Sequence, residues 1–342
     1  MTPPPHAARA SRRGHVLTSE CAAGGWTAAW PVYDTQYQMT LTISARALAG
    51  AMLFSIALAG CGTPASSTSG TNLQVVAGQN FWGSIAAQLG GTHVSVTSIV
   101  TNPNADPHDY ESNPQDARAF ATANYVILNG AGYDEWASKL LAGNPNPGRR
   151  VFTVADLLHK KAGDNPHFWY NPSWVDQVAD RITADYQALD SADSGYFAQQ
   201  RAAFRTALQP YHDRIASIRS SFSGVPVGAT ENIFVYLASA VGLHLISPPE
   251  FMQAVAEGND PPAQTVAQFH DLVAGKKIKV LVYNVQTSTN ITEDLKRQAT
   301  QNGIPVVGVS ETLQPIDATF QEWQDAQLLT LQNALNANAL TH

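Results

Sequence analysis

Cysteine is almost absent from this sequence. Among 342 residues only Cys21 and Cys61 are cysteines, and both lie in the first fifth of the chain. Disulfides pair two thiols, and thiolate metal sites need several, so neither kind of site is available to the residues that follow Cys61. Whatever chemistry the rest of the chain performs must use nitrogen and oxygen groups.

Positive charge is also scarce. The chain carries 20 lysines and arginines against 27 acidic residues, a net charge of -7. It has no basic stripe interleaved with aromatic residues, so the composition argues against a nucleic-acid partner. Hydrophobic residues make up 44% and charged residues 14% of the chain. These fractions are typical of a globular protein with a substantial core, and no tandem repeat interrupts it.

The apolar run at residues 45–59 is shorter than the ~18 to 20 residues that a transmembrane helix needs. It has Arg46 near its start, ends in Leu58-Ala59-Gly60-Cys61, and is followed by small and polar residues at 62–71. This pattern resembles a bacterial lipoprotein signal peptide, which implies cleavage before Cys61 and acylation of its thiol. The alternative is a short transmembrane anchor. On the lipoprotein interpretation, the protein is extracytoplasmic and lipid-anchored to the cell membrane.

Residues 1–38 fit no pattern of a folded protein, because their prolines and tryptophans follow no periodicity. A secretion signal acts from the N-terminus of the translated chain. We therefore expect this stretch to be an overlong gene-start assignment or a disordered extension, with translation beginning near Met39. The signal peptide is then predicted at 39–60 and a tether at 61–72.

From residue 73 onward, short apolar runs alternate with helical patterns. This alternation is typical of βαβ units and predicts an α/β fold with mostly parallel sheets flanked by helices. Strands are expected at 73–77, 94–100, 125–128, 151–153, 225–228, 244–246, 280–283 and 306–309. Helices are expected at 81–89, 113–121, 134–141, 233–241, 263–274, 291–301 and 321–335.

One predicted helix is much longer than a crossover between strands requires. Apolar residues at spacings of three, four or seven predict a continuous helix over 192–222, roughly 45 Å long at ~1.5 Å per residue. Such a helix is suited to join an N-terminal lobe at 73–191 to a C-terminal lobe at 223–342, with a ligand cleft between them. The alternative is an ordinary core helix. The residues that form the apolar face are Phe197, Phe204, Leu208, Tyr211, Ile215 and Ile218.

Four loops place a possible metal ligand soon after a predicted strand. The candidates are His108, His167, Glu231 and Glu311. In open α/β sheets ligands bind beyond the carboxyl ends of the strands, so the four side chains are expected to meet in one cleft. Two imidazoles and two carboxylates suit a divalent transition-metal ion. A proline precedes each histidine and stiffens its loop, which helps a site that selects an ion by geometry.

Each of these residues alone is weak evidence of a metal site. A loop histidine is usually not a ligand, and a carboxylate at a helix start also interacts with the positive end of the helix dipole. The remaining histidines of the region lack a comparable loop context, and we interpret them as surface or packing residues. They include His93, His159, His212, His244 and His270.

Several motifs in a fixed order distinguish the chain from a generic α/β protein. It resembles the zinc- and manganese-type metal-binding lipoproteins of bacterial ABC importers, from about residue 73 to the C-terminus. The resemblance implies two α/β lobes joined by a single long helix. The motifs that carry it are QNFWG at 79–83, NADPHDYE at 104–111, NGAGYDEW at 129–136, NPHFWY at 165–170, TENIFVY at 230–236, EGNDP at 257–261 and YNVQT at 283–287.

Position by position, the resemblance implies roles for the four candidate ligands. His108 and His167 match the two histidine ligands of the N-terminal lobe. Glu231 falls where members of the family have histidine or glutamate. Glu311 falls where they usually have aspartate, and its extra methylene is a departure from the pattern. The histidine- and acid-rich loop of many zinc-type members is missing, because residues 142–164 contain only His159.

The resemblance implies a substrate-binding protein that captures zinc or manganese, with iron also compatible, and delivers it to the permease of an ABC importer. We expect a monomer without enzymatic activity. A metal-dependent hydrolase is the enzymatic alternative, but hydrolytic sites keep an open position for water, which four protein ligands would close. A surface adhesin is the third alternative. Two carboxylates favour manganese or iron, whereas intrinsic affinity favours zinc, so the sequence leaves the metal open.

Overall fold

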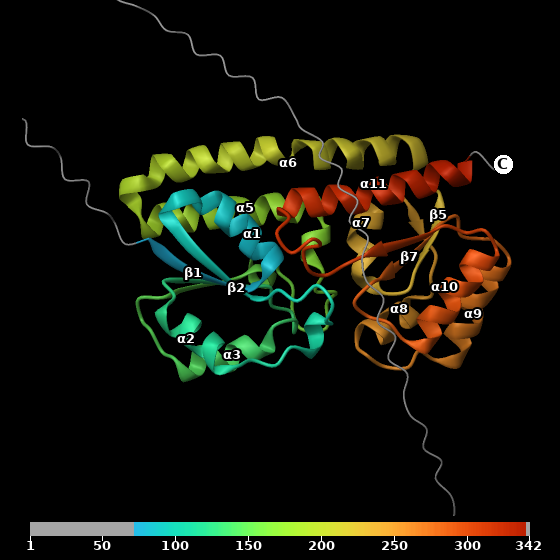
Figure 1. The fold of residues 1–342 in the computed structure, drawn as a ribbon, viewed down its shortest axis with the longest axis horizontal. Helices are drawn as coiled ribbons and strands as arrows, with labels where there is room; N and C mark the ends of the chain where they lie inside the picture. The colour runs from blue at the N-terminus through green and yellow to red at the C-terminus, as the bar shows by residue number, and fades with distance from the viewer. Residues whose placement is uncertain (1–71, 340–342) are drawn as a thin grey trace, which may run out of the picture. The chain divides into compact units, whose positions relative to one another are not determined.

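The computed structural model describes residues 72–339. Within this range eight strands form two parallel four-stranded sheets, one in each of two lobes (Figure 1). Helices cover both faces of the sheets, and one long helix runs along both lobes. The fold class predicted from the sequence is therefore confirmed.

The sheet of the first lobe has the order β2-β1-β3-β4, and all its neighbouring strands are parallel. This order reverses the direction of winding between β1 and β3, which is the place where open α/β sheets form ligand crevices. Because the four strands are parallel, their carboxyl ends all lie at the same edge of the sheet. The strands are β1 (Leu73–Gln79), β2 (Val94–Val100), β3 (Tyr125–Leu128) and β4 (Arg150–Thr153).

Alternate residues of the first sheet face two separate apolar cores, as the two-residue period of a strand requires. Val75 and Ile127 belong to the core that contains α1 (Asn80–Gly90) and α5 (Pro172–Leu189). The neighbouring Val76 and Val126 pack instead with residues of α2 and α3. The remaining helices of this lobe are α2 (Pro114–Thr122), α3 (Glu135–Gly143) and the short α4 (Val154–Leu157).

The second lobe repeats the same strand order, β6-β5-β7-β8, again with parallel pairing. Val282 on β7 faces the core shared with the first lobe, whereas its neighbour Leu281 faces a second apolar cluster. That cluster is closed by helices on the outer face of the sheet. The elements are β5 (Pro226–Ala229), α7 (Val235–Ala240), β6 (His244–Leu245), α8 (Pro249–Ala256), α9 (Ala263–Ala274), β7 (Leu281–Asn284), α10 (Asn290–Gln301) and β8 (Val306–Val309).

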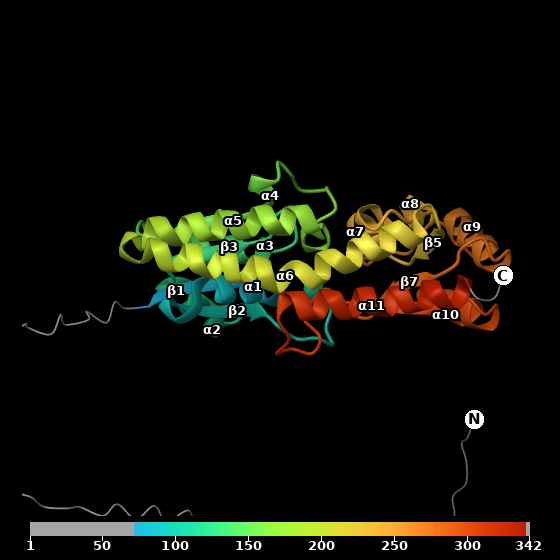
Figure 2. The same ribbon diagram turned by 90° about the horizontal axis from the view of Figure 1, so that it is seen from above.

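The long helix α6 (Ser194–Phe222) runs along both lobes, and α11 (Phe320–Ala339) lies beside its second part, along the second lobe (Figure 2). The predicted apolar face of α6 is buried. The helix begins two residues later than 192, because Ser191–Asp193 form a 3-10 turn. The start of α11 packs on the first lobe, where Trp323 contacts the rings of Phe81 and Tyr170. One apolar core therefore runs through both lobes.

The predictions for the N-terminal region lie outside the described residues. They concern the extension at 1–38, the signal peptide at 39–60, and Cys61 at the start of the tether. Among the helices that are described, none combines the length and the apolar character needed to cross a membrane.

Candidate metal site

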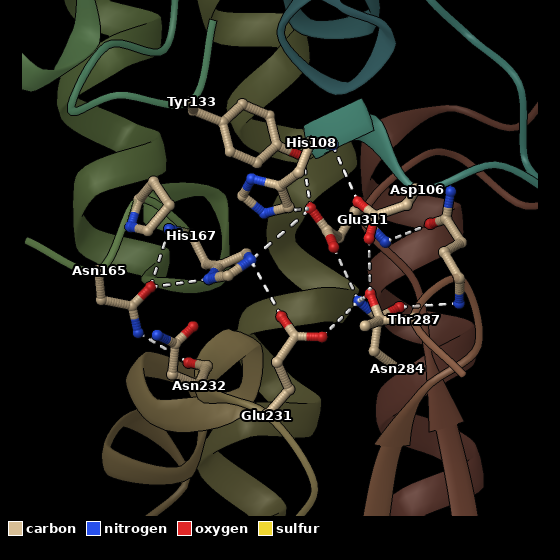
Figure 3. Close-up of polar contacts among 12 residues, drawn as sticks. Asp106, His108, Tyr133, Asn165, His167, Glu231, Asn232, Asn284, Thr287 and Glu311 are labelled. Carbon is tan, nitrogen blue, oxygen red and sulfur yellow. Dashed lines mark hydrogen bonds and ion pairs between the residues drawn. The ribbon is translucent and has the colours of Figure 1, made fainter. Parts of the chain in front are cut away.

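The four predicted ligands all lie beyond the carboxyl ends of strands. His108 lies in the 3-10 turn Pro107–Asp109 after β2, and His167 follows β4 and α4. Glu231 follows β5, and Glu311 follows β8. The two histidines come from the first lobe and the two glutamates from the second, and their side chains turn toward one another (Figure 3).

The structure brings three of the four into one compact group. Ligand atoms of His108, His167 and Glu311 all lie within 4.8 Å of one another. Oε2 of Glu311 is 3.5 Å from Nε2 of His108 and 3.7 Å from Nε2 of His167. Glu231 lies beside this group, with its Oε1 3.5 Å from Nε2 of His167. A small displacement of Glu231 would therefore complete a set of two nitrogens and two oxygens.

Hydrogen bonds fix which nitrogen of His167 faces the group. Nδ1 lies 2.7 Å from Oδ1 of Asn165, and Nδ2 of Asn165 donates to the carbonyl oxygen of Asn232 at 2.7 Å. The second bond sets the orientation of the amide, so its oxygen must accept from Nδ1–H of the imidazole. Nε2 of His167 is then the unprotonated nitrogen, which is the arrangement that metal-binding histidines adopt.

Both glutamates are held by neutral hydrogen-bond donors. Nδ2 of Asn284 lies 2.8 Å from Oε2 of Glu231 and 2.7 Å from Oε1 of Glu311. The hydroxyl of Tyr133 donates to Oε2 of Glu311 at 2.6 Å. Oε1 of Glu231 and Nε2 of His167 are both buried and have no hydrogen-bond partner. Buried polar atoms are nearly always satisfied, so this facing pair calls for a proton or a cation between the two atoms.

The pKa values of the two glutamates are shifted in opposite directions. Burial, reinforced by the charge of Glu311, raises the pKa of Glu231 well above its usual range. Burial alone would raise the pKa of Glu311 too, but contacts with His167 and His108 lower it to about 2. Burial lowers the pKa of His167. In the absence of a metal ion, these shifts favour a neutral His167, an ionised Glu311 and a protonated Glu231.

A cavity of about 490 Å³ adjoins the site from the histidine side. His108 and His167 line it, whereas neither glutamate does. The side chain of His108 is 27% exposed, and that of His167 is fully buried. The acidic residues of the wall are Asp106, Asp109, Asp164 and Glu257. A wall of this charge attracts cations, so an ion approaching through the cavity meets His108 first and the glutamates last.

Gln286 joins the two lobes next to the site. Its Oε1 accepts hydrogen bonds from the backbone N–H groups of Glu311 and Thr312, at 2.6 and 3.1 Å. Its Nε2 donates to the carbonyl oxygen of Ala105 at 2.7 Å. Ala105 belongs to the loop that carries His108, so one side chain fixes the ligand loop of each lobe relative to the other.

The other histidines within residues 72–339 lie elsewhere. Near the start of β2, Nδ1 of His93 lies 2.7 Å from Oδ2 of Asp193, and Asp190 is close enough to form a second group of possible ligands. All three are half-buried, and the His93 ring packs on Tyr196 with centroids 4.0 Å apart. These contacts are those of an ion pair that fastens β2 to the turn before α6. His212 similarly pairs with Asp176.

The sequence did not predict the residues that hydrogen-bond to the candidate ligands, which are Tyr133, Asn165 and Asn284. A signal for each was present. Asn284 is the last residue of β7, at the same sheet edge as the predicted ligands. Tyr133 follows β3 in the same way, and Asn165 lies within the motif that contains His167.

Comparisons with known proteins identify the family of this chain. The family model for "Zinc-uptake complex component A periplasmic" matches residues 75–334. A curated relative, the manganese-binding lipoprotein MntA of Halalkalibacterium halodurans, is 26% identical over 248 residues, which cover 70% of this chain and 80% of that protein.

Two solved structures share the fold. The crystal structure of ZnuA has a TM-score of 0.62 and 24% identity, covering 78% of this chain and 100% of that one. The SBP FpvC of Pseudomonas aeruginosa, in complex with Mn2+, has a TM-score of 0.64 and 19% identity, covering 78% and 99%. At these identities the likeness establishes the two-lobed architecture.

Proposed function

The chain belongs to the family of periplasmic zinc-uptake component A proteins, and we propose that it captures a divalent transition-metal ion outside the cell and delivers it to the permease of an ABC importer. Zinc and manganese are the candidate ions. The proposed ligands are His108, His167, Glu231 and Glu311, two from each lobe. The ion would then bridge the two lobes, in the ligand cleft that the sequence predicts between them.

The observation that carries this proposal is the facing pair of unsatisfied atoms. Nε2 of His167 and Oε1 of Glu231 are buried, lie 3.5 Å apart, and lack hydrogen-bond partners. Two lone pairs directed at each other repel unless a proton or a cation lies between them. Oε2 of Glu311 and Nε2 of His108 stand beside the same point. A metal ion there would satisfy all four atoms.

The charge of the group fits a divalent cation. Within residues 72–339, the basic side chains paired with Glu231 and Glu311 are histidines only. Two carboxylates without a lysine or arginine partner carry a charge of minus two when ionised. Burying unpaired charge costs free energy, and an ion of charge plus two cancels it. A monovalent ion would leave the site negative.

Binding and release, rather than catalysis, suits this ligand set. A hydrolytic metal site keeps a coordination position for water and a general base beside it. Here both glutamates point into the site, and Asn284 occupies the other oxygen of each. We therefore propose a transport protein without enzymatic activity, acting as a monomer and held at the outer face of the membrane by a lipid on Cys61.

The experiment that tests this function is metal titration of the purified full chain after removal of bound metal by chelator. We expect one zinc or manganese ion per chain, with binding abolished in His167→Ala and retained in His270→Ala. His270 is a matched control because it is half-buried and hydrogen-bonded to Gln298, far along the sequence from the ligands. Equal binding by both variants would contradict the site. Hydrolysis of ester or peptide probes by the metal-loaded chain would instead favour the hydrolase.

A further inference from the structure

Asn284 contacts both glutamates with a single amide nitrogen. Its Nδ2 donates one hydrogen bond to Oε2 of Glu231 at 2.8 Å and one to Oε1 of Glu311 at 2.7 Å (Figure 3). A carboxamide nitrogen carries two hydrogens, and Oγ1 of Thr287, at 3.1 Å, is a third and more distant acceptor, so the two shorter bonds to the glutamates take up most of its donor capacity. Asn284 is 1% exposed, and the glutamates are 1% and 0% exposed. Water has little access to replace either bond.

The backbone determines the orientation of this amide. The N–H of Gln286 donates to Oδ1 of Asn284 at 3.0 Å. A backbone N–H can only donate, so the amide oxygen must face it and the nitrogen must face the glutamates. The opposite orientation would press the amide oxygen against two carboxylate oxygens. The backbone N–H of Gln286 thus fixes the amide nitrogen of Asn284 as the donor to the two glutamates.

These bonds leave one oxygen of each glutamate for an ion. The oxygens directed at His167 are Oε1 of Glu231 and Oε2 of Glu311. For either carboxylate to chelate with both oxygens, it would have to turn and release Asn284. That release would exchange a short hydrogen bond to a carboxylate for the longer contact with Oγ1 of Thr287, which costs free energy. Tyr133 holds Oε2 of Glu311 from the other side and further restricts its rotation.

From this geometry we propose that Asn284 is a specificity-determining residue that keeps both carboxylates monodentate and so favours zinc. Two imidazole nitrogens and two single oxygens make a four-coordinate site, which suits the tetrahedral preference of zinc. Manganese prefers six ligands rich in oxygen, which bidentate carboxylates would supply. The inference rests on the proposed function. It assigns zinc although the curated relative described above is named for manganese.

The test measures the dissociation constants of the full chain for Zn²⁺ and Mn²⁺ by chelator competition. In Asn284→Ala the carboxylates are free to turn, and we expect the preference for zinc over manganese to fall by about tenfold or more, which is the scale seen when a residue that holds a metal ligand is replaced. The control is Asn165→Ala, which removes the anchor of His167. It should weaken both metals together and leave their ratio unchanged.

Cobalt(II) provides a second readout, because four-coordinate cobalt absorbs visible light much more strongly than six-coordinate cobalt. The cobalt-loaded wild type should show the strong bands, and Asn284→Ala should show weaker ones. If Asn284→Ala does not fold, as judged by circular dichroism, Tyr133→Phe serves as the second variant. It keeps the ring, frees Oε2 of Glu311, and should shift the ratio in the same direction.

The outcomes distinguish a failure of the proposed function from a failure of the inference about zinc selectivity. A wild type that binds neither zinc nor manganese refutes the proposed function. A wild type that binds metal but gives the weak cobalt bands of six-coordination overturns the selectivity inference alone. So does an unchanged affinity ratio in Asn284→Ala and Tyr133→Phe, because Asn284 would then only support the fold.

Discussion

Tyr133 and Glu311 join the two lobes by a hydrogen bond of 2.6 Å at the centre of the proposed metal site. The accepting oxygen, Oε2, is the one that lies near both His108 and His167. The Tyr133 hydroxyl is deeply buried, and burial together with the charge of Glu311 raises its pKa well above the usual range. Tyr133 therefore stays a neutral donor and positions Glu311 before an ion arrives.

The first prediction concerns Gln286, the other link between the lobes. Gln286→Ala removes the acceptor for the backbone N–H groups of Glu311 and Thr312, and Thr312 is fully buried. Unsatisfied buried donors cost about 1–3 kcal/mol each, so we expect the free energy of unfolding to fall by about that amount. Urea denaturation measures this. Gln209→Ala is the control, because Gln209 is exposed and its side chain hydrogen-bonds to Asp213 on its own helix. An equal loss of stability in both variants would contradict the role of Gln286 in joining the lobes.

The second prediction separates the two histidines. His108→Ala and His167→Ala should each weaken metal binding by orders of magnitude, because each removes a ligand. The metal-free proteins should differ, since His167 is fully buried and bonded to Asn165, whereas His108 is 27% exposed. His167→Ala leaves a cavity and an unpaired amide, and we expect it to cost about 2–4 kcal/mol of stability.

Thermal melting with and without metal measures both effects. Metal raises the melting temperature of the wild type by mass action, because the unfolded chain lacks the assembled site. Neither histidine variant should show this rise. A rise equal to that of the wild type in either one would remove that histidine from the ligand set.

Much of the fold could be predicted because its strands are short, apolar and regularly spaced. Tyr125–Leu128 and Val306–Val309 begin and end as expected, and Ala263–Ala274 is a helix over the predicted range. The 18-residue helix Pro172–Leu189 was not predicted. Its signals were present: Asn171 caps its first turn, Pro172 occupies its first position, and the buried residues recur at helical spacing. The NPHFWY motif at 165–170, which directly precedes this helix, indicates a loop.

The site could be predicted only in part, for a physical reason. A candidate ligand such as His108 can be recognised from its residue type and from its place after a strand. A supporting residue such as Asn284 does not, because its role depends on distances to Glu231 and Glu311, which come from other strands. The sequence also gives no sign that α11 packs on the first lobe through Trp323. Such contacts arise from packing between segments far apart in the chain.

The third prediction concerns Cys61, whose role rests on the sequence. In its native host the wild-type protein should partition into detergent and carry the added mass of a lipid. Cys61→Ser removes the thiol that would be acylated, so it should yield a protein of lower mass that is released from the membrane. Cys21→Ser is the control and should leave anchoring unchanged. A Cys61→Ser protein that stays in the membrane with unaltered mass would refute the lipoprotein interpretation.

The fourth prediction is that metal binding releases a proton and strengthens as pH rises. Burial and the charge of Glu311 raise the pKa of Glu231, so the metal-free site holds a proton on this carboxyl below that pKa. A metal ion must displace it, since a coordinating carboxylate is deprotonated. Below the raised pKa of Glu231, affinity should therefore drop up to about tenfold per pH unit for one displaced proton. Glu311, whose pKa is about 2, adds nothing to this dependence near neutral pH.

Calorimetry in buffers of different ionisation enthalpy counts the released proton directly. Glu231→Gln keeps the size of the side chain but removes both the charge and the proton. Its amide can still face Nε2 of His167, 3.5 Å from the original oxygen, so the fold should be retained. Affinity should fall strongly, and the binding that remains should release no proton from this position. If Glu231→Gln releases as many protons as the wild type, the proton belongs to another group and Glu231 is not the titrating ligand.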